Sequence, residues 1–371
     1  MDTEATMNSG PTNFATCTPV AFHANDYFYT RDTGLICREL RKGGYSCRVI
    51  MPLPAQEDDL NADELIRVPM RNLSQPSWWR GAGIDGVILY SWGDPRYTSI
   101  ARAIRKAGLK LIIHFDSSGE LHEHLQRPGR RWLNAIKDCA VNLLRRLHLG
   151  YAHAITTSGP CIDSFRKDSY YGAAIADKCH EFPAPVNSCF RYEGSTKKAR
   201  IICTGSWQYP VKRAELMMRT LETTLHHHTT AQADICGTLT PALEAWHSSL
   251  SAEMQQRIHL HGQCSHAHLS ELCNAACISL CTSESEGSHG ASAEALCCGC
   301  SVVCPPRPLL SVVQWYTSRN SGTVAAEDTP EALSIAVLAE LQLWRDGTRQ
   351  ASAIATAWQP CFQASSLPDL L

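Results

Sequence analysis

The sequence lacks a charge excess of either sign, and it lacks a long apolar run. Its 371 residues hold 34 lysines and arginines against 36 aspartates and glutamates, so the net charge is -2. Binding to nucleic acid would have to rest on a local basic patch, and no nucleic-acid partner is expected. The uncharged stretch 350–368 is rich in Gln, Ser and Thr and contains Pro360. It is therefore not the apolar segment of roughly 20 residues that a membrane-spanning helix needs.

The start of the chain lacks the pattern of a secretory signal, because no positive flank there precedes an apolar run. Cysteine, in contrast, is plentiful, with 18 residues. Together these two features predict a cytoplasmic protein whose thiols stay free. The polar, turn-rich residues 1–18 are expected to form a flexible tail.

Short apolar runs alternate with helical patterns along most of the chain, which is typical of α/β domains with buried parallel sheets. The runs that predict strands are 46–51, 86–90, 110–114, 152–157, 200–203, 234–237, 258–261, 277–281 and 301–304. Predicted helices include 98–107, 132–147, 162–167, 212–225, 242–254, 267–275, 292–298 and 330–344. We therefore predict two Rossmann-like domains, at 19–185 and 200–345, joined by a linker at 186–199.

Two carboxylates with seven residues between them stand in the segment TSESEGSHGASAEALCCGCSVV, residues 282–303. Glu286 falls in the loop after a predicted strand, and Glu294 falls near the start of the next predicted helix. In open α/β sheets, ligands bind outside the carboxyl ends of the strands. A helix start also offers free N–H groups to anionic or hydroxyl-rich ligands. Taken alone, the two glutamates could also be solvated or capping residues.

This segment resembles the E-x7-E signature of retaining glycosyltransferases of family 4, which have the GT-B fold. The residues in register with the signature are Ser283, Glu286, Gly287, Glu294, Ala295, Gly299, Val302 and Val303. Other segments that resemble elements of this family, in the family's order, are ITTSGPCIDSFRK with HEFPAPVNSCF, IICTGSWQYPVKRAELMM, IHLHGQCSHAHLSELCNAACISL and NSGTVAAEDTPEALSIAVLAEL. The resemblance spans residues 30–345 and is clearest over 200–345.

The resemblance implies a nucleotide-sugar donor in the C-terminal domain, an acceptor in the N-terminal domain, and transfer with retention of configuration in the cleft between them. By this resemblance, Glu294 binds the ribose hydroxyls and Glu286 contacts the transferred sugar. Lys212 and Arg213 would neutralise the diphosphate leaving group, although a Lys-Arg pair at a helix start is also common on a solvated face. The other donor-side residues implied are Gly205, Gly262, Gly287, Ser288, His289, Gly290, Ala291 and Ser292.

On the N-terminal side, the resemblance points to three residues. Gly34, in RDTGLI, stands where the family has a Gly-rich loop, and we assign it to the acceptor side together with Asp116. His114 and Asp116 follow a predicted strand, where the family often has an acidic or His residue that faces the cleft. His114 is assigned a catalytic role, with a purely structural histidine as the alternative. The last segment, 346–371, is expected to contain a helix at 348–358 that crosses back to the N-terminal domain.

The sequence departs from the family pattern in three places. Ser206 stands where an Arg commonly follows the glycine of the phosphate element, and the Gly-rich loop is reduced to Gly34. The segment CPPRPLLSVVQWYTSRN replaces the family's Gly-Gly…Glu segment. The alternative function is therefore a catalytically inactive GT-B-like protein that binds a nucleotide or glycan or acts as a scaffold. A nucleotide-sugar epimerase fits less well, because no paired catalytic carboxylates and His are recognised.

The chain contains no D-x-D sequence, which argues against the metal-dependent GT-A glycosyltransferases. No metal and no other cofactor are expected, since cationic side chains and helix N-termini would balance the diphosphate. Four closely spaced cysteines resemble the ligands of a metal cluster, but the signature assigns them to small-residue positions of a helix and a strand. They are Cys297, Cys298, Cys300 and Cys304.

A basic segment, RPGRRWLNAIKDCAVNLLRRLHLG, occupies residues 127–150. Besides Trp132 and several leucines, it carries Arg127, Arg130, Arg131, Lys137, Arg145 and Arg146. Such a helix could attract anionic lipid at the inner face of a membrane, where a lipid-linked acceptor is glycosylated. The alternative is an ordinary solvated helix.

Overall fold

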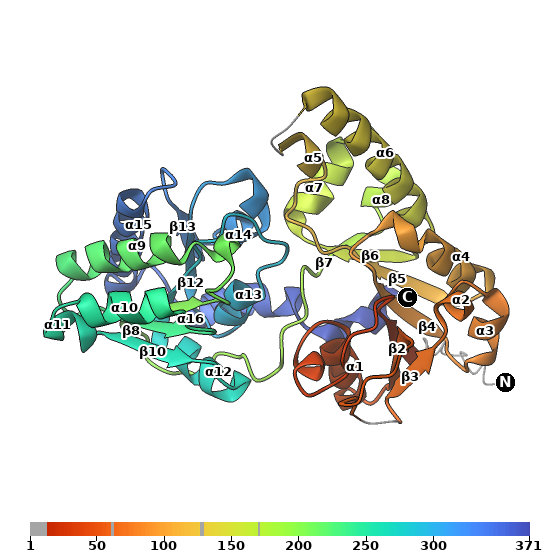
Figure 1. Cartoon of the computed structure of the whole chain (residues 1–371), viewed down its shortest axis with the longest axis horizontal. Helices are drawn as coiled ribbons and strands as arrows, with labels where there is room; N and C mark the ends of the chain where they lie inside the picture. The colour runs from red at the N-terminus through yellow and green to blue at the C-terminus, as the bar shows by residue number, and fades with distance from the viewer. Residues whose placement is uncertain (1–12, 61–62, 127–129, 170) are drawn as a thin grey trace, which may run out of the picture.

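The computed structural model describes residues 13–60, 63–126, 130–169 and 171–371. They form two α/β domains that lie side by side in Figure 1, each built on a parallel sheet. This confirms the predicted pair of Rossmann-like domains. In both sheets the innermost strands are buried on both faces, because helices cover both sides of a parallel sheet.

The N-terminal sheet has the strand order β3-β2-β1-β4-β5-β6-β7. Its strands are β1 (Asn13–Cys17), β2 (Ser46–Pro52), β3 (Leu65–Val68), β4 (Gly86–Tyr90), β5 (Lys110–His114), β6 (Ala154–Thr157) and β7 (Cys179–Glu181). Its helices are α1 (Asp32–Lys42), α2 (Met70–Leu73), α3 (Pro76–Gly81), α4 (Thr98–Lys106), α5 (Glu123–Gln126), α6 (Arg131–Gly150), α7 (Gly159–Lys167) and α8 (Ala173–Ala176).

The C-terminal sheet has the strand order β10-β9-β8-β11-β12-β13. Its strands are β8 (Lys198–Thr204), β9 (Gln232–Cys236), β10 (Ile258–Gly262), β11 (Ala276–Leu280), β12 (Ser301–Cys304) and β13 (Gly322–Val324). Its helices are α9 (Ala214–His227), α10 (Pro241–Ser249), α11 (Ala252–Gln255), α12 (His266–Ala275), α13 (Gly290–Cys297), α14 (Ser311–Trp315) and α15 (Pro330–Arg345). The final helix, α16 (Ala351–Trp358), packs on α13.

The strand order reverses between β1 and β4 in the first sheet and between β8 and β11 in the second. At such a point, successive crossovers run to opposite sides of the sheet, so the loops at the carboxyl ends diverge and leave a crevice. The loops after β8 and β11 hold Lys212 and Glu286, and the loop after β5 holds Asp116. The topology thus places the predicted site residues at the crevices of both domains.

The prediction of a flexible tail over residues 1–18 is wrong for its last part; residues 1–12 lie outside the described part of the chain. Asn13–Cys17 form β1, which pairs with β2 and β4 in the centre of the sheet. Ala15, Thr16 and Cys17 are fully buried. The segment NFATC contains a single large apolar residue, and its small side chains gave no hydrophobic signal.

A second correction concerns the single helix predicted at 242–254, which is two helices, α10 and α11. Leu250 is extended, and Ser251 begins the second helix by accepting a hydrogen bond at its Oγ from Met254 N. Besides β1, the short elements that were not predicted are β3, β7, β13, α2, α3, α5, α8 and α14.

The chain passes between the domains twice. The segment after β7 contributes Val186 and Phe190 to the core of the C-terminal domain. At the other end, Trp358 of α16 packs in that same core, whereas Leu367 packs in the core of the N-terminal domain. The predicted helix therefore does not itself cross back. The return to the N-terminal domain comes after Phe362, which still packs in the C-terminal core, and before Ala364, which packs in the N-terminal core. The two crossings are joined by a hydrogen bond of 3.2 Å from Val186 N to Phe362 O.

Candidate active site

Residues of both domains line a cleft of about 700 Å³ at the carboxyl ends of the two sheets. The N-terminal domain supplies Tyr27, Thr30, Arg31, Asp32 and Asp116, and the segment after β7 supplies Ala184 and Pro185. The C-terminal domain supplies Thr204, Gly205, Ser206, Lys212, Cys236, Gly237, Thr238, Gln263, Cys264, His266, Leu269, Glu286, Gly287, Ser288, His289, Gly290, Ala291 and Glu294. Most of the residues singled out in the sequence therefore meet in one place.

The loop that follows β11 (residues 281–289, the signature loop) is held against the loop that precedes α9. Glu284 N donates to Val211 O at 2.8 Å, and Thr282 Oγ1 donates to Lys212 O at 2.9 Å. These bonds bring Lys212 Nζ to 2.6 Å from Glu286 Oε1. Glu286 is thus fixed by a charge-assisted hydrogen bond at the wall of the cleft.

Burial by itself would raise the pKa of Glu286, but the neighbouring His289 and Lys212 and the hydrogen bond from Lys212 outweigh it, so this pKa is lowered. Glu286 is therefore an anion at neutral pH. An anion at this position can accept hydrogen bonds from sugar hydroxyls and can stabilise positive charge on a reacting sugar ring.

His289 caps the start of α13 with a left-handed backbone, at φ 44°. Its Nδ1 shares a hydrogen bond of 2.7 Å with Ser292 Oγ, and burial lowers the pKa of His289 to about 4, so the ring is neutral at pH 7. Ser292 is fully buried under this ring and does not line the cleft. The structure therefore gives Ser292 the place of a residue that orients His289.

Glu294 lies one turn into α13, on the side of the helix that faces the cleft. Burial raises the pKa of Glu294 to about 8. At pH 7 this carboxyl is therefore mainly protonated and can both donate and accept hydrogen bonds. Such a group matches a ligand that presents a pair of hydroxyls.

Asp116 of the N-terminal domain lies directly against Gly287 of the signature loop. A Cβ atom at Gly287 would lie 2.6 Å from Asp116 Oδ1, so no larger residue fits there without movement. Burial and the charge of Asp32 raise the pKa of Asp116 to about 7, although hydrogen bonding to Ser288 opposes the shift. Asp116 can therefore change its protonation state near neutral pH.

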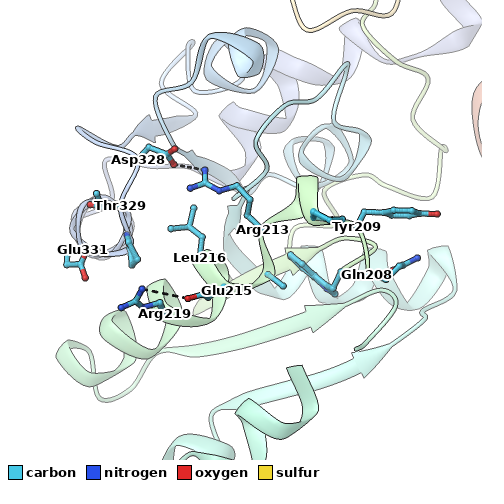
Figure 2. Close-up of a pocket in the computed structure, with 13 residues that line it drawn as sticks. Gln208, Tyr209, Arg213, Glu215, Leu216, Arg219, Asp328, Thr329 and Glu331 are labelled. Carbon is cyan, nitrogen blue, oxygen red and sulfur yellow. Dashed lines mark hydrogen bonds and ion pairs between the residues drawn. The ribbon is translucent and has the colours of Figure 1, made fainter. Parts of the chain in front are cut away.

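Arg213 does not belong to this cleft, which corrects its predicted place beside Lys212. Arg213 has a left-handed backbone, at φ 53°, and its Nη1 donates to Asp328 Oδ1 at 2.6 Å. Figure 2 shows this pair on the wall of a separate pocket of about 670 Å³ beside α9, where Arg219 also pairs with Glu215. The reversed backbone at Arg213 turns its side chain away from the neighbouring Lys212.

Two residues predicted on the N-terminal side also lie outside the cleft. His114 is fully buried, stacks on Tyr90 with ring centroids 4.2 Å apart, and shares a hydrogen bond of 3.0 Å with Thr156 Oγ1. Burial lowers the pKa of His114 to about 3, which fits a neutral core residue. Gly34 is buried in α1, where a Cβ would meet Phe28 O at 2.5 Å. The structure supports the structural alternative for His114, and it places Gly34 in the packing between α1 and Phe28.

Apart from Asp116, the residues that line the N-terminal side lie just before α1 or at its first residue, and they were missed in the sequence. Tyr27, Thr30, Arg31 and Asp32 belong to a loop that ends in a residue with a left-handed backbone, Asp32 at φ 49°. Their proximity to Gly34 was the available signal. Arg31 Nε donates to Asp32 Oδ2 at 2.7 Å, so this side of the cleft presents a paired cation and anion.

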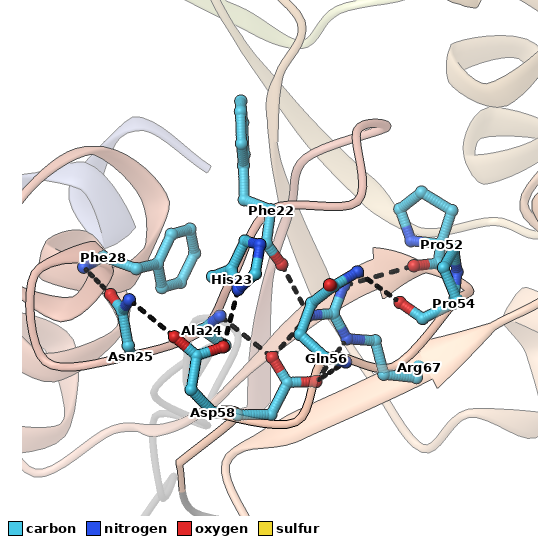
Figure 3. A network of polar contacts seen from close by, with 11 residues as sticks. Phe22, His23, Ala24, Asn25, Phe28, Pro52, Pro54, Gln56, Asp58 and Arg67 are labelled. Atoms are coloured by element: carbon cyan, nitrogen blue, oxygen red, sulfur yellow. Dashed lines mark hydrogen bonds and ion pairs between the residues drawn. The ribbon is translucent and has the colours of Figure 1, made fainter.

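A polar network holds this loop in place (Figure 3). Arg67 donates to Asp59 through Nε and Nη2, at 2.9 and 2.6 Å, and to Phe22 O through Nη2. Asp58 pairs with His23 and accepts from Asn25 Nδ2 at 3.0 Å. Since these contacts join the segment before Tyr27 to β3, the network positions the loop that contains Tyr27.

The other end of the cleft is formed by the carboxyl ends of β8, β9 and β10. Gly237 has a φ of 106°, and a Cβ there would lie 1.9 Å from Gly205 O, so the two backbones touch. Gly262 lies beside the cleft and accepts a hydrogen bond of 2.7 Å from Gly237 N. Gln263 and Thr238, which were not predicted, share a hydrogen bond of 2.8 Å at this end.

Among residues 13–60, 63–126, 130–169 and 171–371, no group of three or more His, Cys, Asp or Glu side chains has the geometry to hold a metal ion. All 18 cysteines are free thiols.

The whole molecule superposes on several solved structures. It matches sucrose-phosphate synthase from Thermosynechococcus elongatus with a TM-score of 0.60 and 14% identity, over 96% of each chain. It matches HepE from Anabaena, solved in complex with UDP, with a TM-score of 0.63 and 12% identity, over 96% of this chain and 97% of that one. The chain has the GT-B fold.

The catalytic domain of starch synthase IV from Arabidopsis thaliana, bound to ADP and acarbose, is a further GT-B structure that matches. Its TM-score is 0.57 at 10% identity, over 98% of this chain and 99% of that one. Residues 198–342, which make up most of the C-terminal GT-B domain, match the family model of glycosyl transferases group 1. No curated protein matches the sequence. The matched segment contains Lys212, the signature loop and Glu294.

Proposed function

We propose that the protein is a retaining glycosyltransferase of family 4 that moves a sugar from a nucleotide-diphosphate donor to an acceptor hydroxyl. The observation that carries this proposal is the pairing of Lys212 with Glu286 at 2.6 Å in a cleft that Asp116 closes from the opposite domain. A cation for a leaving group and an anion for a sugar thus stand side by side where the two domains meet. The match of residues 198–342 to glycosyl transferases group 1 supports it.

For the donor, we assign the nucleotide to the end of the cleft formed by β8, β9 and β10 and by the start of α13. Glu294 binds the ribose hydroxyls, since its protonated carboxyl both donates and accepts. The structural neighbour HepE is solved with UDP and with UDP-glucose, which supports a nucleotide sugar. Gly205 and Gly237 line this end of the cleft, where their two backbones lie in contact with each other.

For the leaving diphosphate, we assign charge stabilisation to Lys212 and to the backbone N–H groups at the start of α13, at residues 290 and 291. Negative charge grows on the leaving phosphate as the bond to the sugar breaks, and prearranged donors stabilise that charge. We propose that no metal takes part. Among the described residues that line the cleft, the C-terminal domain supplies one lysine and no arginine.

For the acceptor, we propose a carbohydrate hydroxyl that enters beside Asp116 and Asp32. Asp116, with a pKa of about 7, accepts a hydrogen bond from this hydroxyl when it is ionised. Retention in family 4 is attributed to attack from the face of the leaving group, whose phosphate helps to remove the proton. No covalent nucleophile is therefore required. The abundance of free thiols supports a cytoplasmic location, and we propose a role in glycan or glycolipid biosynthesis.

The test is to incubate the purified protein with a panel of UDP-, GDP- and ADP-sugars and to measure release of the nucleotide. Turnover with one donor, lost in Glu286→Ala, is the expected result, and proton NMR of the first product formed reports the anomer. An inverted product would refute retention. Absence of turnover with every donor, together with no effect of Glu286→Ala on nucleotide binding, would refute the enzyme.

The turned-away Arg213 favours one alternative, a GT-B protein that binds a nucleotide or glycan without catalysis. Arg213 is paired with Asp328, and Ser206 stands where a second cation would reach the diphosphate. Calorimetric titration distinguishes the two functions. Nucleotide binding without any turnover, unchanged in Glu286→Ala, would support the binding protein.

A further inference from the structure

Helix α6 (Arg131–Gly150) has its polar side facing the protein and its apolar side facing outward. In Figure 1 it runs along the outer rim of the N-terminal domain, away from the C-terminal domain. A surface helix of a globular protein normally does the reverse. The reversal calls for an explanation in terms of what covers the apolar side.

The inward side of α6 carries three buried polar residues beside the buried Leu149, and each of the three makes at least one polar contact with the rest of the domain. Asp138 pairs with His122, and Asn142 Oδ1 accepts a hydrogen bond of 2.7 Å from Tyr171 OH. His148 Nε2 shares a hydrogen bond of 2.9 Å with Ser91 Oγ. Because buried polar groups are costly unless they are hydrogen-bonded, these pairings fix the rotation of the helix about its axis.

The outward side carries large apolar side chains that are 46–62% exposed. They are Trp132, Leu133, Ile136, Leu143, Leu144 and Leu147. At 100° per residue, these six fall within an arc of about 120° opposite the buried polar side. Of the 13 large apolar residues that are exposed in the described parts of the chain, these six lie on this one helix. We call them the α6 stripe.

Basic residues border the α6 stripe on both sides. Lys137 follows one edge, Arg146 follows the other, and Arg130 and Arg131 stand at the start of the helix, all four of them exposed. The one acidic residue within Arg131–Gly150 is Asp138, which is buried. The surface is thus apolar in the middle and positive at its borders. Arg127, predicted to belong to it, lies outside the described residues.

We propose that the α6 stripe docks on an anionic lipid bilayer, with the helix lying in the plane of the interface. Apolar side chains enter the boundary between headgroups and acyl chains, while the bordering cations meet anionic headgroups. No helix in the described parts of the chain is both long enough and apolar enough to span a bilayer, so α6 lies on the surface instead.

Charge favours this occupant over a second copy of the chain. In a symmetric dimer, the same patch meets itself, so Lys137 and Arg146 of one copy would face the cations of the other. An anionic surface, in contrast, is attracted from both edges of the stripe at once. The proposal does not depend on the glycosyltransferase activity, and binding is measured without donor or acceptor.

The consequence for the cleft follows from the connection between α6 and Asp116. Leu121 O, five residues after Asp116, accepts a hydrogen bond of 3.2 Å from Asn142 Nδ2 of α6. Docking would therefore hold the acceptor side of the cleft at a fixed distance from the lipid surface, which suits an acceptor that is itself anchored in lipid.

The test is co-sedimentation of the full chain with vesicles of phosphatidylcholine, pure or with about one-third phosphatidylglycerol. We expect binding to the anionic vesicles that weakens with salt. Leu143→Glu with Leu147→Glu should weaken it at least tenfold. Ile335→Glu, on α15 of the other domain and 68% exposed, is the matched control and should bind as the wild type does.

A second variant, Lys137→Gln with Arg146→Gln, isolates the contribution of charge. It should lower binding to anionic vesicles several-fold and leave any residual binding to neutral vesicles unchanged. Both variants should fold, because Leu143, Leu147, Lys137 and Arg146 are all exposed. Circular dichroism and the thermal midpoint of each variant test this. If a variant does not fold, Trp132→Ser with Ile136→Ser replaces it.

Three outcomes would overturn the proposal. In the first, the wild type does not sediment with either vesicle. In the second, Leu143→Glu with Leu147→Glu binds as tightly as Ile335→Glu does. In the third, sedimentation velocity shows a dimer that the leucine variant dissociates, without vesicle binding, which would assign the α6 stripe to a second copy of the chain.

Discussion

Lys212 Nζ lies 2.6 Å from Glu286 Oε1, so the cation that we assign to the diphosphate is held by the anion that we assign to the sugar. Each group therefore fixes the charge state and the position of the other. A substitution of either one changes both, and their effects on turnover should not add.

Lys212→Ala should lower kcat by about 100-fold, because the leaving phosphate loses a prearranged cation. Arg213→Ala, at the next position, should leave kcat nearly unchanged, since Arg213 is paired with Asp328 outside the cleft. Steady-state kinetics with the donor identified in the panel compares the two variants. Equal losses would contradict the placement of Arg213.

Gly287→Ala should lower kcat/KM strongly with little change in the stability of either domain, because its Cβ would lie 2.6 Å from Asp116 Oδ1 and would force the domains apart. Gly81→Ala, in α3 and away from the cleft, is the matched control, since a Cβ there also meets nothing within 4 Å. Shortening the opposing side chain in Gly287→Ala with Asp116→Ala should restore nucleotide affinity in part. Equal effects of the two alanine substitutions would show that steric contact between the domains is unimportant.

Glu294 should make the stability of the protein fall as pH rises. Its pKa is raised from 4.5 to about 8 on folding, so between these values the folded chain holds a proton that the unfolded chain has lost. Folding then favours low pH, and the contribution declines until pH reaches about 8. Urea unfolding as a function of pH should show a shallower decline in Glu294→Gln. Glu253→Gln, at a side chain 76% exposed, should follow the wild type.

Asp59 should have the opposite effect on the pH dependence of stability, because its pKa is lowered on folding. The pKa of this carboxyl is lowered to about 2, because hydrogen bonds from Arg67 and from the backbone N–H groups of Gln56 and Ala24 outweigh its burial. Its contribution is complete above the unfolded value of 3.8 and is lost as pH falls toward about 2. Arg67→Met should cost about 2 kcal/mol in the free energy of unfolding at pH 7, because it removes two charge-assisted hydrogen bonds to the partly buried Asp59.

Arg67→Met should also raise the KM for the acceptor, since the network of Figure 3 positions the loop that contains Tyr27. Arg96→Met is a matched control, because Arg96 pairs with Asp94 at the surface, where such pairs contribute little. A variant with normal acceptor KM and normal stability would show that the network has no positioning role.

The sequence predicted the elements that consist mainly of large, buried apolar side chains. Gly86–Tyr90 and Lys110–His114 were predicted with their observed bounds, because GVILY and KLIIH are buried almost throughout. β1 was missed because it has one large apolar residue. The buried Ala15, Thr16 and Cys17 have small side chains that give no hydrophobic pattern in the sequence. The order of strands comes from pairing at a distance, which local composition does not encode.

The candidate site shows the same division. Glu286 and Glu294 were correctly predicted to share one cleft, because their spacing places one in the loop after a strand and the other in the first turns of the next helix. The direction of Arg213 depends on one backbone angle, and the burial of His114 depends on the ring of Tyr90 from another strand. Asp32 lines the cleft and has a left-handed backbone, which its residue type does not predict.

The two crossings between the domains are hydrogen-bonded to each other through Val186 and Phe362. Two linked crossings form an interdomain hinge. Such a hinge would allow one domain to rotate against the other and would oppose sliding of the domains past each other. Asp116 and Gly287 would then separate and meet again along one arc, in the same register on every cycle. The alignment of the two domains in the closed cleft would thus depend on the two crossings between them, in addition to the contact between Asp116 and Gly287.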